Sequence, residues 1–179
     1  MKKLIMCEGP NELALVKILL KNNMLSFDED DLLGLTPYHA RQIATSGQVK
    51  TELNMYNGPV EILRIGDKQN DELKIPREYK EMIVSVAKYC TKPELEILLI
   101  IAEGLYGEFQ KNKSKKSPKD FAKEKIKYNG QRYNNSTKFF ESYFGDRPQL
   151  LYDSIRDYYK VNKGHKKGEG YLAELLREI

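Results

Sequence analysis

The sequence has little of what several familiar enzyme sites need. It contains no tryptophan, two cysteines and two histidines among 179 residues. Cys7 and Cys90 form no CxxC pair, and His39 and His165 stand alone, so a zinc site is not expected. No GxxxxGK[ST] phosphate loop, GxGxxG motif or GxSxG elbow occurs. These absences argue against a P-loop nucleotide site, a dinucleotide site and a serine nucleophile elbow.

Long hydrophobic runs are also missing. The longest, residues 95 to 102, is interrupted by Glu96 and is far shorter than the roughly 20 apolar residues of a membrane-spanning helix. No N-terminal apolar stretch has the length of a signal peptide. The two cysteines are typical of reduced core residues of an intracellular protein. We therefore expect a cytoplasmic protein with no membrane partner.

Charge is abundant and unevenly distributed. Charged residues make up 31% of the chain, and the net charge is +4. Residues 110–138 contain ten Lys or Arg and two acids, so the rest of the chain is net acidic. Such asymmetry favours a nucleic-acid partner. A Lys-rich, solvated surface loop is the alternative.

The first 90 residues have the pattern of an α/β fold. The continuous apolar run 4–7 indicates a strand buried on both faces, and the mainly apolar stretch 60–65 indicates a second strand. Between them, the pattern predicts a helix at 10–20, a short strand at 32–35 and a helix at 46–55. This β-α-β-α-β order predicts a parallel, Rossmann-like sheet with right-handed crossovers.

The second half is predicted to be helical. Apolar spacing and N-terminal helix signals predict helices at 76–87, 92–110, 118–127, 137–144, 148–159 and 171–178. We therefore expect an α/β core over 1–90 and a helical extension over 91–179 that carries the basic segment 110–138, both within one compact unit.

Acidic residues follow both predicted buried strands. Glu8 ends the first, with Glu12 one helical turn later, and Asp67 ends the strand at 60–65, with Asp71 four residues on. Ligands gather at the carboxyl ends of strands in open α/β sheets, and Mg²⁺ prefers carboxylate oxygens. A site for Mg²⁺ or Mn²⁺ is one interpretation. The alternative is that Glu12 complements a helix N-terminus and the aspartates belong to a polar turn.

Two further features bear on a site. Glu96 is the single charge in an apolar helical run, so it needs a basic partner or a place in the site, unless it lies on a solvated stripe with Glu103.

Basic residues of the segment 110–138 could neutralise phosphates, and interleaved aromatics could stack on bases. The candidate phosphate-binding residues are Lys111, Lys113, Lys115, Lys116, Lys119, Lys123 and Arg132.

The order strand, Glu8-Gly9-x-x-Glu12, helix, with a later strand ending in Asp67, resembles the Toprim fold of topoisomerases, primases and small nucleases. Residues 92–99, KPELEILL, are similar to the corresponding helix of RloB-type and OLD-type Toprim proteins of phage defence. The resemblance implies a Mg²⁺-dependent nuclease in which Glu8 moves protons and Asp67 binds metal. It also implies a second metal-binding acid two residues after Asp67, where this chain has Gln69; Asp71 or Glu12 would have to replace it.

Three functions therefore remain open. The first is a metal-dependent nuclease acting on DNA or RNA, with Glu8 and Asp67 as catalytic residues and Glu96 in support. The second is a non-catalytic nucleic-acid-binding module with a degenerate metal site, which Gln69 favours. The third is a protein-interaction subunit, with an ATPase as a candidate partner.

Overall fold

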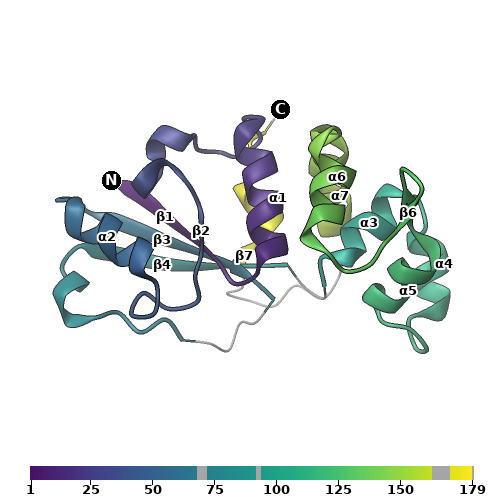
Figure 1. The fold of residues 1–179 in the computed structure, drawn as a ribbon, viewed down its shortest axis with the longest axis horizontal. Helices are drawn as coiled ribbons and strands as arrows, with labels where there is room; N and C mark the ends of the chain where they lie inside the picture. Colours follow the sequence, from purple (N-terminus) through teal and green to yellow (C-terminus); the bar gives the residue numbers. More distant parts are fainter. Residues whose placement is uncertain (68–71, 92–93, 163–169, 179) are drawn as a thin grey trace.

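The computed structural model describes residues 1–67, 72–91, 94–162 and 170–178. Over these residues the chain forms a five-stranded, all-parallel sheet with strand order β2-β1-β3-β4-β7 (Figure 1). The strands are β1 (Lys2–Cys7), β2 (Tyr38–His39), β3 (Val60–Gly66), β4 (Ile83–Cys90) and β7 (Gly170–Tyr171). The expected α/β class with a parallel sheet is confirmed.

The centre of the sheet is the pair β1 and β3. All six residues of β1 align with β3, from Lys2 opposite Val60 to Cys7 opposite Ile65. Both strands are apolar over most of their length because each face of the sheet is covered by other elements. The carboxyl ends of β1 and β3 therefore lie side by side, which is the arrangement that the sequence pattern predicted.

The sheet separates two hydrophobic clusters. Alternate side chains of β1 and β3 pack on opposite faces, as the period of a strand requires. Ile5 and Leu63 pack with α1 (Pro10–Lys21), whereas Leu4 and Ile62 pack with α2 (Gly47–Met55). Pro10 opens α1 at its first turn, and the Ser46 hydroxyl caps α2 by accepting from the Val49 N–H, 3.3 Å away.

The helical half packs against α1. Its helices are α3 (Glu96–Ala102), α4 (Tyr106–Asn112), α5 (Pro118–Lys125), α6 (Thr137–Gly145) and α7 (Pro148–Val161), and a two-stranded hairpin joins β5 (Lys127–Tyr128) to β6 (Gln131–Arg132). Phe140, Tyr143 and Leu151 belong to the same buried cluster as Ile5 and Leu63. In Figure 1, α6 and α7 lie beside α1, and α4 and α5 form the end of the molecule farthest from α2.

Four predicted elements are wrong. Residues 32–35 form a 3₁₀ turn, η2 (Leu33–Leu35), with Gly34 at φ +69°, and the second strand comes later, at Tyr38–His39. The helix predicted at 76–87 is instead a 3₁₀ turn, η3 (Arg77–Tyr79), followed by β4, where β-branched residues pair with β3. A short apolar run fits the period of a helix and that of a strand equally well, and here the hydrogen bonds to β3 select the strand.

The other two corrections concern helix ends. The long helix predicted at 92–110 is divided at Gly104, whose φ of +70° ends α3 before α4 begins. The helix predicted at 171–178 is replaced by β7, which pairs with β4 through Tyr171 opposite Cys90, and by the 3₁₀ turn η4 (Leu172–Leu175). Among the described helices, none is long and apolar enough to cross a membrane.

Candidate functional site

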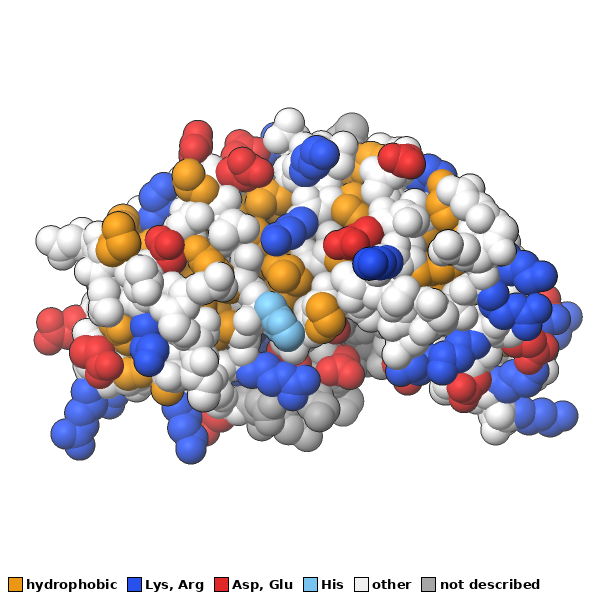
Figure 2. All heavy atoms as spheres, viewed as in Figure 1, with side chains coloured by type: hydrophobic (Ala, Val, Ile, Leu, Met, Phe, Trp, Pro, Cys, Tyr) orange, Lys and Arg blue, Asp and Glu red, His pale blue; other side chains and the backbone are white. Residues whose placement is uncertain are grey.

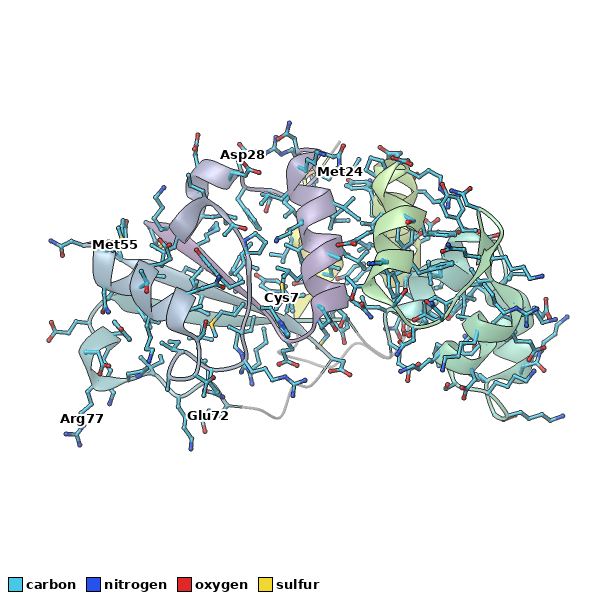
Figure 3. The ribbon with its side chains drawn as sticks, in the orientation of Figure 1. Cys7, Met24, Asp28, Met55, Glu72 and Arg77 are labelled. Carbon is cyan, nitrogen blue, oxygen red and sulfur yellow. The ribbon has the colours of Figure 1, made fainter. Side chains whose placement is uncertain are left out.

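Glu8 lies directly after β1, against the end of β3. Its backbone N–H donates to the Ile65 carbonyl at 2.9 Å, which extends the ladder between the two strands by one residue. Its carboxylate packs against Gly66, where an added Cβ would collide with it. Asp67 follows Gly66 and is exposed. The structure thus brings Glu8 and Asp67 to the same edge of the sheet, near Cys7 at the base of α1 in Figure 3.

Arg64 binds Glu8 inside the protein. The Arg64 Nη2 atom lies 3.4 Å from Glu8 Oε1, and the two residues are 2% and 5% exposed. Arg64 also donates to the Arg41 carbonyl at 3.4 Å, while Arg41 Nε donates to the Glu8 carbonyl at 3.2 Å. Two arginines therefore hold both the side chain and the backbone of Glu8. Sequence reasoning missed Arg64, although a lone charge between Leu63 and Ile65 was a visible signal.

Glu12 lies in the first turn of α1 and is half-buried. Its carboxylate folds back over Gly9, so that a Cβ at position 9 would collide with it. Burial raises the pKa of Glu12, and the charges of Asp67, Glu8 and Glu96 raise it further. The charges of three other carboxylates therefore act on Glu12 at this edge of the sheet.

Glu96 opens α3 and is 6% exposed. Its carboxylate accepts a hydrogen bond from the Tyr133 hydroxyl at 2.5 Å. The sequence led us to expect a basic partner or a place in the site, and the structure shows instead the hydroxyl of a buried tyrosine. Burial, and then the hydrogen bond and charge of Glu96, raise the pKa of Tyr133 well above its usual range. The Tyr133 hydroxyl is therefore protonated even at alkaline pH and remains a donor to Glu96.

The donor chemistry at this edge suits a hard cation. Mg²⁺ is usually bound by one or two carboxylates, with water and substrate phosphate completing its shell. Asp67 is exposed and Glu12 is half-buried; burial is the main cause of the raised pKa of Glu12, and a cation would relieve the added contribution of the neighbouring negative charges. No three Asp, Glu, His or Cys residues within the described ranges are grouped to hold a metal ion. Asp71 and Gln69 lie outside those ranges.

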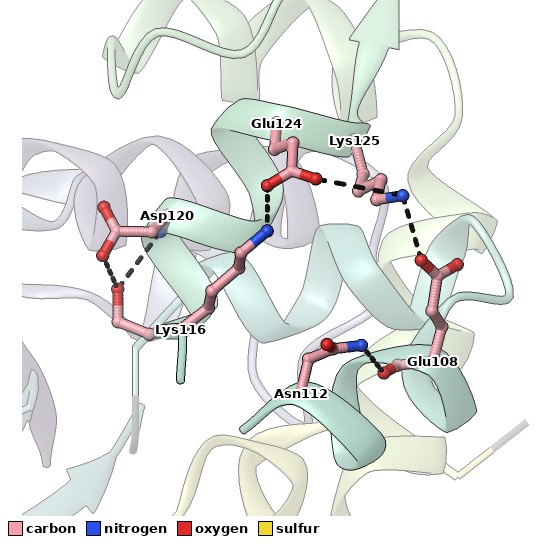
Figure 4. A network of polar contacts seen from close by, with 7 residues as sticks. Glu108, Asn112, Lys116, Asp120, Glu124 and Lys125 are labelled. Carbon is pink, nitrogen blue, oxygen red and sulfur yellow. Dashed lines mark hydrogen bonds and ion pairs between the residues drawn. The ribbon is translucent and has the colours of Figure 1, made fainter. Parts of the chain in front are cut away.

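The basic segment lies at the far end of the helical half. Figure 2 shows Lys and Arg side chains gathered over α4 and α5. Lys116 pairs with Glu124, and Lys125 pairs with Glu108 at 3.0 Å (Figure 4), while the half-buried Lys119 donates its backbone N–H to Glu94. The other candidate phosphate-binding residues are exposed, and no ion pair within the described chain involves them: Lys111, Lys113, Lys115, Lys123 and Arg132.

The aromatics interleaved with these lysines do not face solvent. Phe121 and Tyr133 are buried in the core, and Tyr128 lies under the Arg147 guanidinium, 4.3 Å from its ring centre. The suggested stacking of bases on these rings is therefore wrong for Phe121 and Tyr133.

Comparison of the chain with protein-family models, curated proteins and solved structures finds no match. Function is therefore inferred from the geometry of the chain itself.

Proposed function

We propose that the protein is a metal-dependent nuclease of the Toprim type that cleaves nucleic-acid phosphodiesters at the edge formed by β1 and β3. The observation that carries the proposal is the position of Glu8, whose backbone bonds Ile65 and whose carboxylate lies against Gly66, beside Asp67. In such a site, Mg²⁺ would polarise the phosphate and activate a water molecule.

The residues at this edge have different roles in the proposal. Asp67 and Glu12 hold the cation, because they are the carboxylates of the cluster with exposed or half-buried positions. Glu8 accepts a proton from the attacking water, and Arg64 fixes the carboxylate that does so. Glu96 is held by Tyr133 and supports the site through its charge.

The sharpest test replaces Asp67, because an exposed side chain can be changed with little effect on the fold. Asp67→Asn should raise the Mg²⁺ concentration needed for half-maximal cleavage by about tenfold or more, since metal affinity depends on the charge and type of each ligand. Asp146→Asn is a matched control, because Asp146 is exposed and lies in the helical half, at the end of α6. Cleavage of labelled single- and double-stranded DNA and RNA would be followed on gels across a Mg²⁺ titration. Equal activity of Asp67→Asn and Asp146→Asn at every Mg²⁺ concentration would refute the assignment.

A binding module without catalysis is the second candidate. It is favoured by the buried pair of Glu8 with Arg64, because a carboxylate that already has a counter-charge is a poorer general base and metal ligand. This candidate predicts salt-sensitive binding of nucleic acid and no turnover at any concentration of Mg²⁺ or Mn²⁺.

A further inference from the structure

A basic groove lies between the end of α4, the segment that follows it, and the end of α7. Its lining includes Tyr106, Lys113, Lys115, Lys116, Tyr158 and Asn162. None of these residues belongs to the acidic edge. Their chemistry combines ammonium groups with two phenol rings, so the groove offers both charge and flat apolar faces to a ligand.

The charges of the groove favour an anion. Lys113 and Lys115 are exposed, and within the described part of the chain neither forms an ion pair. Lys116 is bound to Glu124, which keeps that lysine in place beside the groove. Ammonium groups spaced along a groove neutralise successive phosphates of a polynucleotide.

The rings of the groove are neutral and half-buried. Burial raises the pKa of Tyr158 to about 12, with smaller contributions from Tyr106 and Tyr171, so its phenol keeps its proton at neutral pH. Tyr106 and Tyr158 both line the groove and are only partly covered by the protein. Phenol rings in such positions can stack on bases whose faces are open.

A smaller hollow adjoins the groove. Tyr158 and Asn162 also line a neighbouring hollow, whose other residues include Cys90 and Thr91 at the end of β4. The Thr91 N–H donates to the Gly66 carbonyl at 3.2 Å, and Gly66 supports the Glu8 carboxylate. The hollow beside the groove is therefore lined in part by the end of β4, whose neighbour Thr91 bonds the end of β3.

We infer that this groove binds a single-stranded polynucleotide, an inference that rests on the proposed function for its substrate class. A duplex hides the faces of its bases, so only a single strand can use both the lysines and the tyrosines. The contacts go to phosphates and base faces, so DNA and RNA strands both bind. The groove adds to the proposed nuclease a preference for unpaired substrate.

The test measures binding in EDTA, where no cleavage occurs, by fluorescence anisotropy of the full chain with labelled oligo-dT and oligo-U of about 15 nucleotides. The double variant Lys113→Ala/Lys115→Ala should bind more weakly and should lower the slope of log K against log salt by about 1.4, since each phosphate contact of a single strand contributes about 0.7. Lys127→Ala/Lys138→Ala removes the same charge from exposed positions outside the groove and should leave the slope unchanged.

A second pair of variants tests stacking. Tyr106→Leu should weaken binding by about tenfold, whereas Tyr106→Phe, which keeps the ring, should bind like the wild type. Three results would overturn the inference: equal losses in the two lysine double variants, a duplex of the same length that binds as tightly as the single strand, or an oligoglutamate peptide that displaces the single strand at equal charge concentration. Binding is measured without metal, so the two proposals can fail separately. A protein that binds single strands in this way but cleaves no nucleic acid would refute the proposed nuclease activity and support the strand-binding groove.

Discussion

The buried ion pair between Arg64 and Glu8 predicts a large loss of stability when Arg64 is replaced by methionine. The two side chains are 2% and 6% exposed, with 3.4 Å between Nη2 and Oε1. Arg64→Met keeps most of the volume but leaves the Glu8 carboxylate buried without its guanidinium. Removing one partner of a buried pair costs about 3–5 kcal/mol. For a domain of this size each kcal/mol lowers Tm by about 2–4 °C, so the expected decrease is about 6–20 °C.

Thermal unfolding followed by circular dichroism, with urea unfolding as a second measure, would test this prediction in EDTA. Arg132→Met is the matched control, because Arg132 is exposed and its replacement should change the free energy of unfolding by no more than about 0.5 kcal/mol. Adding Glu8→Gln to Arg64→Met should restore part of the loss, since a neutral amide is less costly to bury than a carboxylate. An Arg64→Met protein as stable as the Arg132→Met control would show that the pair does not support the fold.

Two further predictions concern the other carboxylates of the cluster. Tyr133→Phe removes the hydroxyl that donates to buried Glu96 and should lower the free energy of unfolding by about 1.5–3 kcal/mol; a loss below about 0.5 kcal/mol by urea unfolding would contradict it. Glu12→Gln should stabilise the protein at neutral pH. Burial, and then the charges of neighbouring acids, raise the pKa of Glu12 in the folded protein. The wild type therefore loses stability as the pH rises from the unfolded pKa of about 4.3 through the folded pKa. Urea unfolding in EDTA should give equal stabilities below that window and a growing advantage for Glu12→Gln across it, and an advantage at low pH would be inconsistent with this cause.

The centre of the sheet could be predicted because its signals are local. Leu4 to Cys7 is an uninterrupted apolar run followed by Glu8, and Val60 to Ile65 is mainly apolar with Asp67 two residues after it, a pattern typical of central strands covered on both faces. Parallel pairing then follows from the helices between them. The meeting of Glu8 with Asp67 could be predicted from this topology, because the carboxyl ends of neighbouring parallel strands lie at one edge.

The other strands could not be predicted because their signals are not local. The segment that forms β4 has exposed Val84 and Val86, so its apolar residues do not mark one buried face, and it becomes a strand by pairing with β3. Strand β7 is two residues long and forms because Tyr171, near the end of the chain, pairs with Cys90, near its middle. The same reason explains why the partner of Glu96 was not found, since Tyr133 comes from a different element 37 residues away.

The structure divides the acidic cluster into two kinds of carboxylate. Glu8 and Glu96 are buried and each is held by a partner, Arg64 or Tyr133, so they contribute to the fold whatever the protein does. Asp67 is exposed and Glu12 is half-buried; burial raises the pKa of Glu12, and the charges of the other acids raise it further. A fold gains nothing from gathering like charges, because their repulsion disfavours the ionised state. A bound cation would offset this repulsion, so stabilisation of the wild type by Mg²⁺, diminished in Asp67→Asn, is the measurement that separates a metal site from an acidic edge of the sheet.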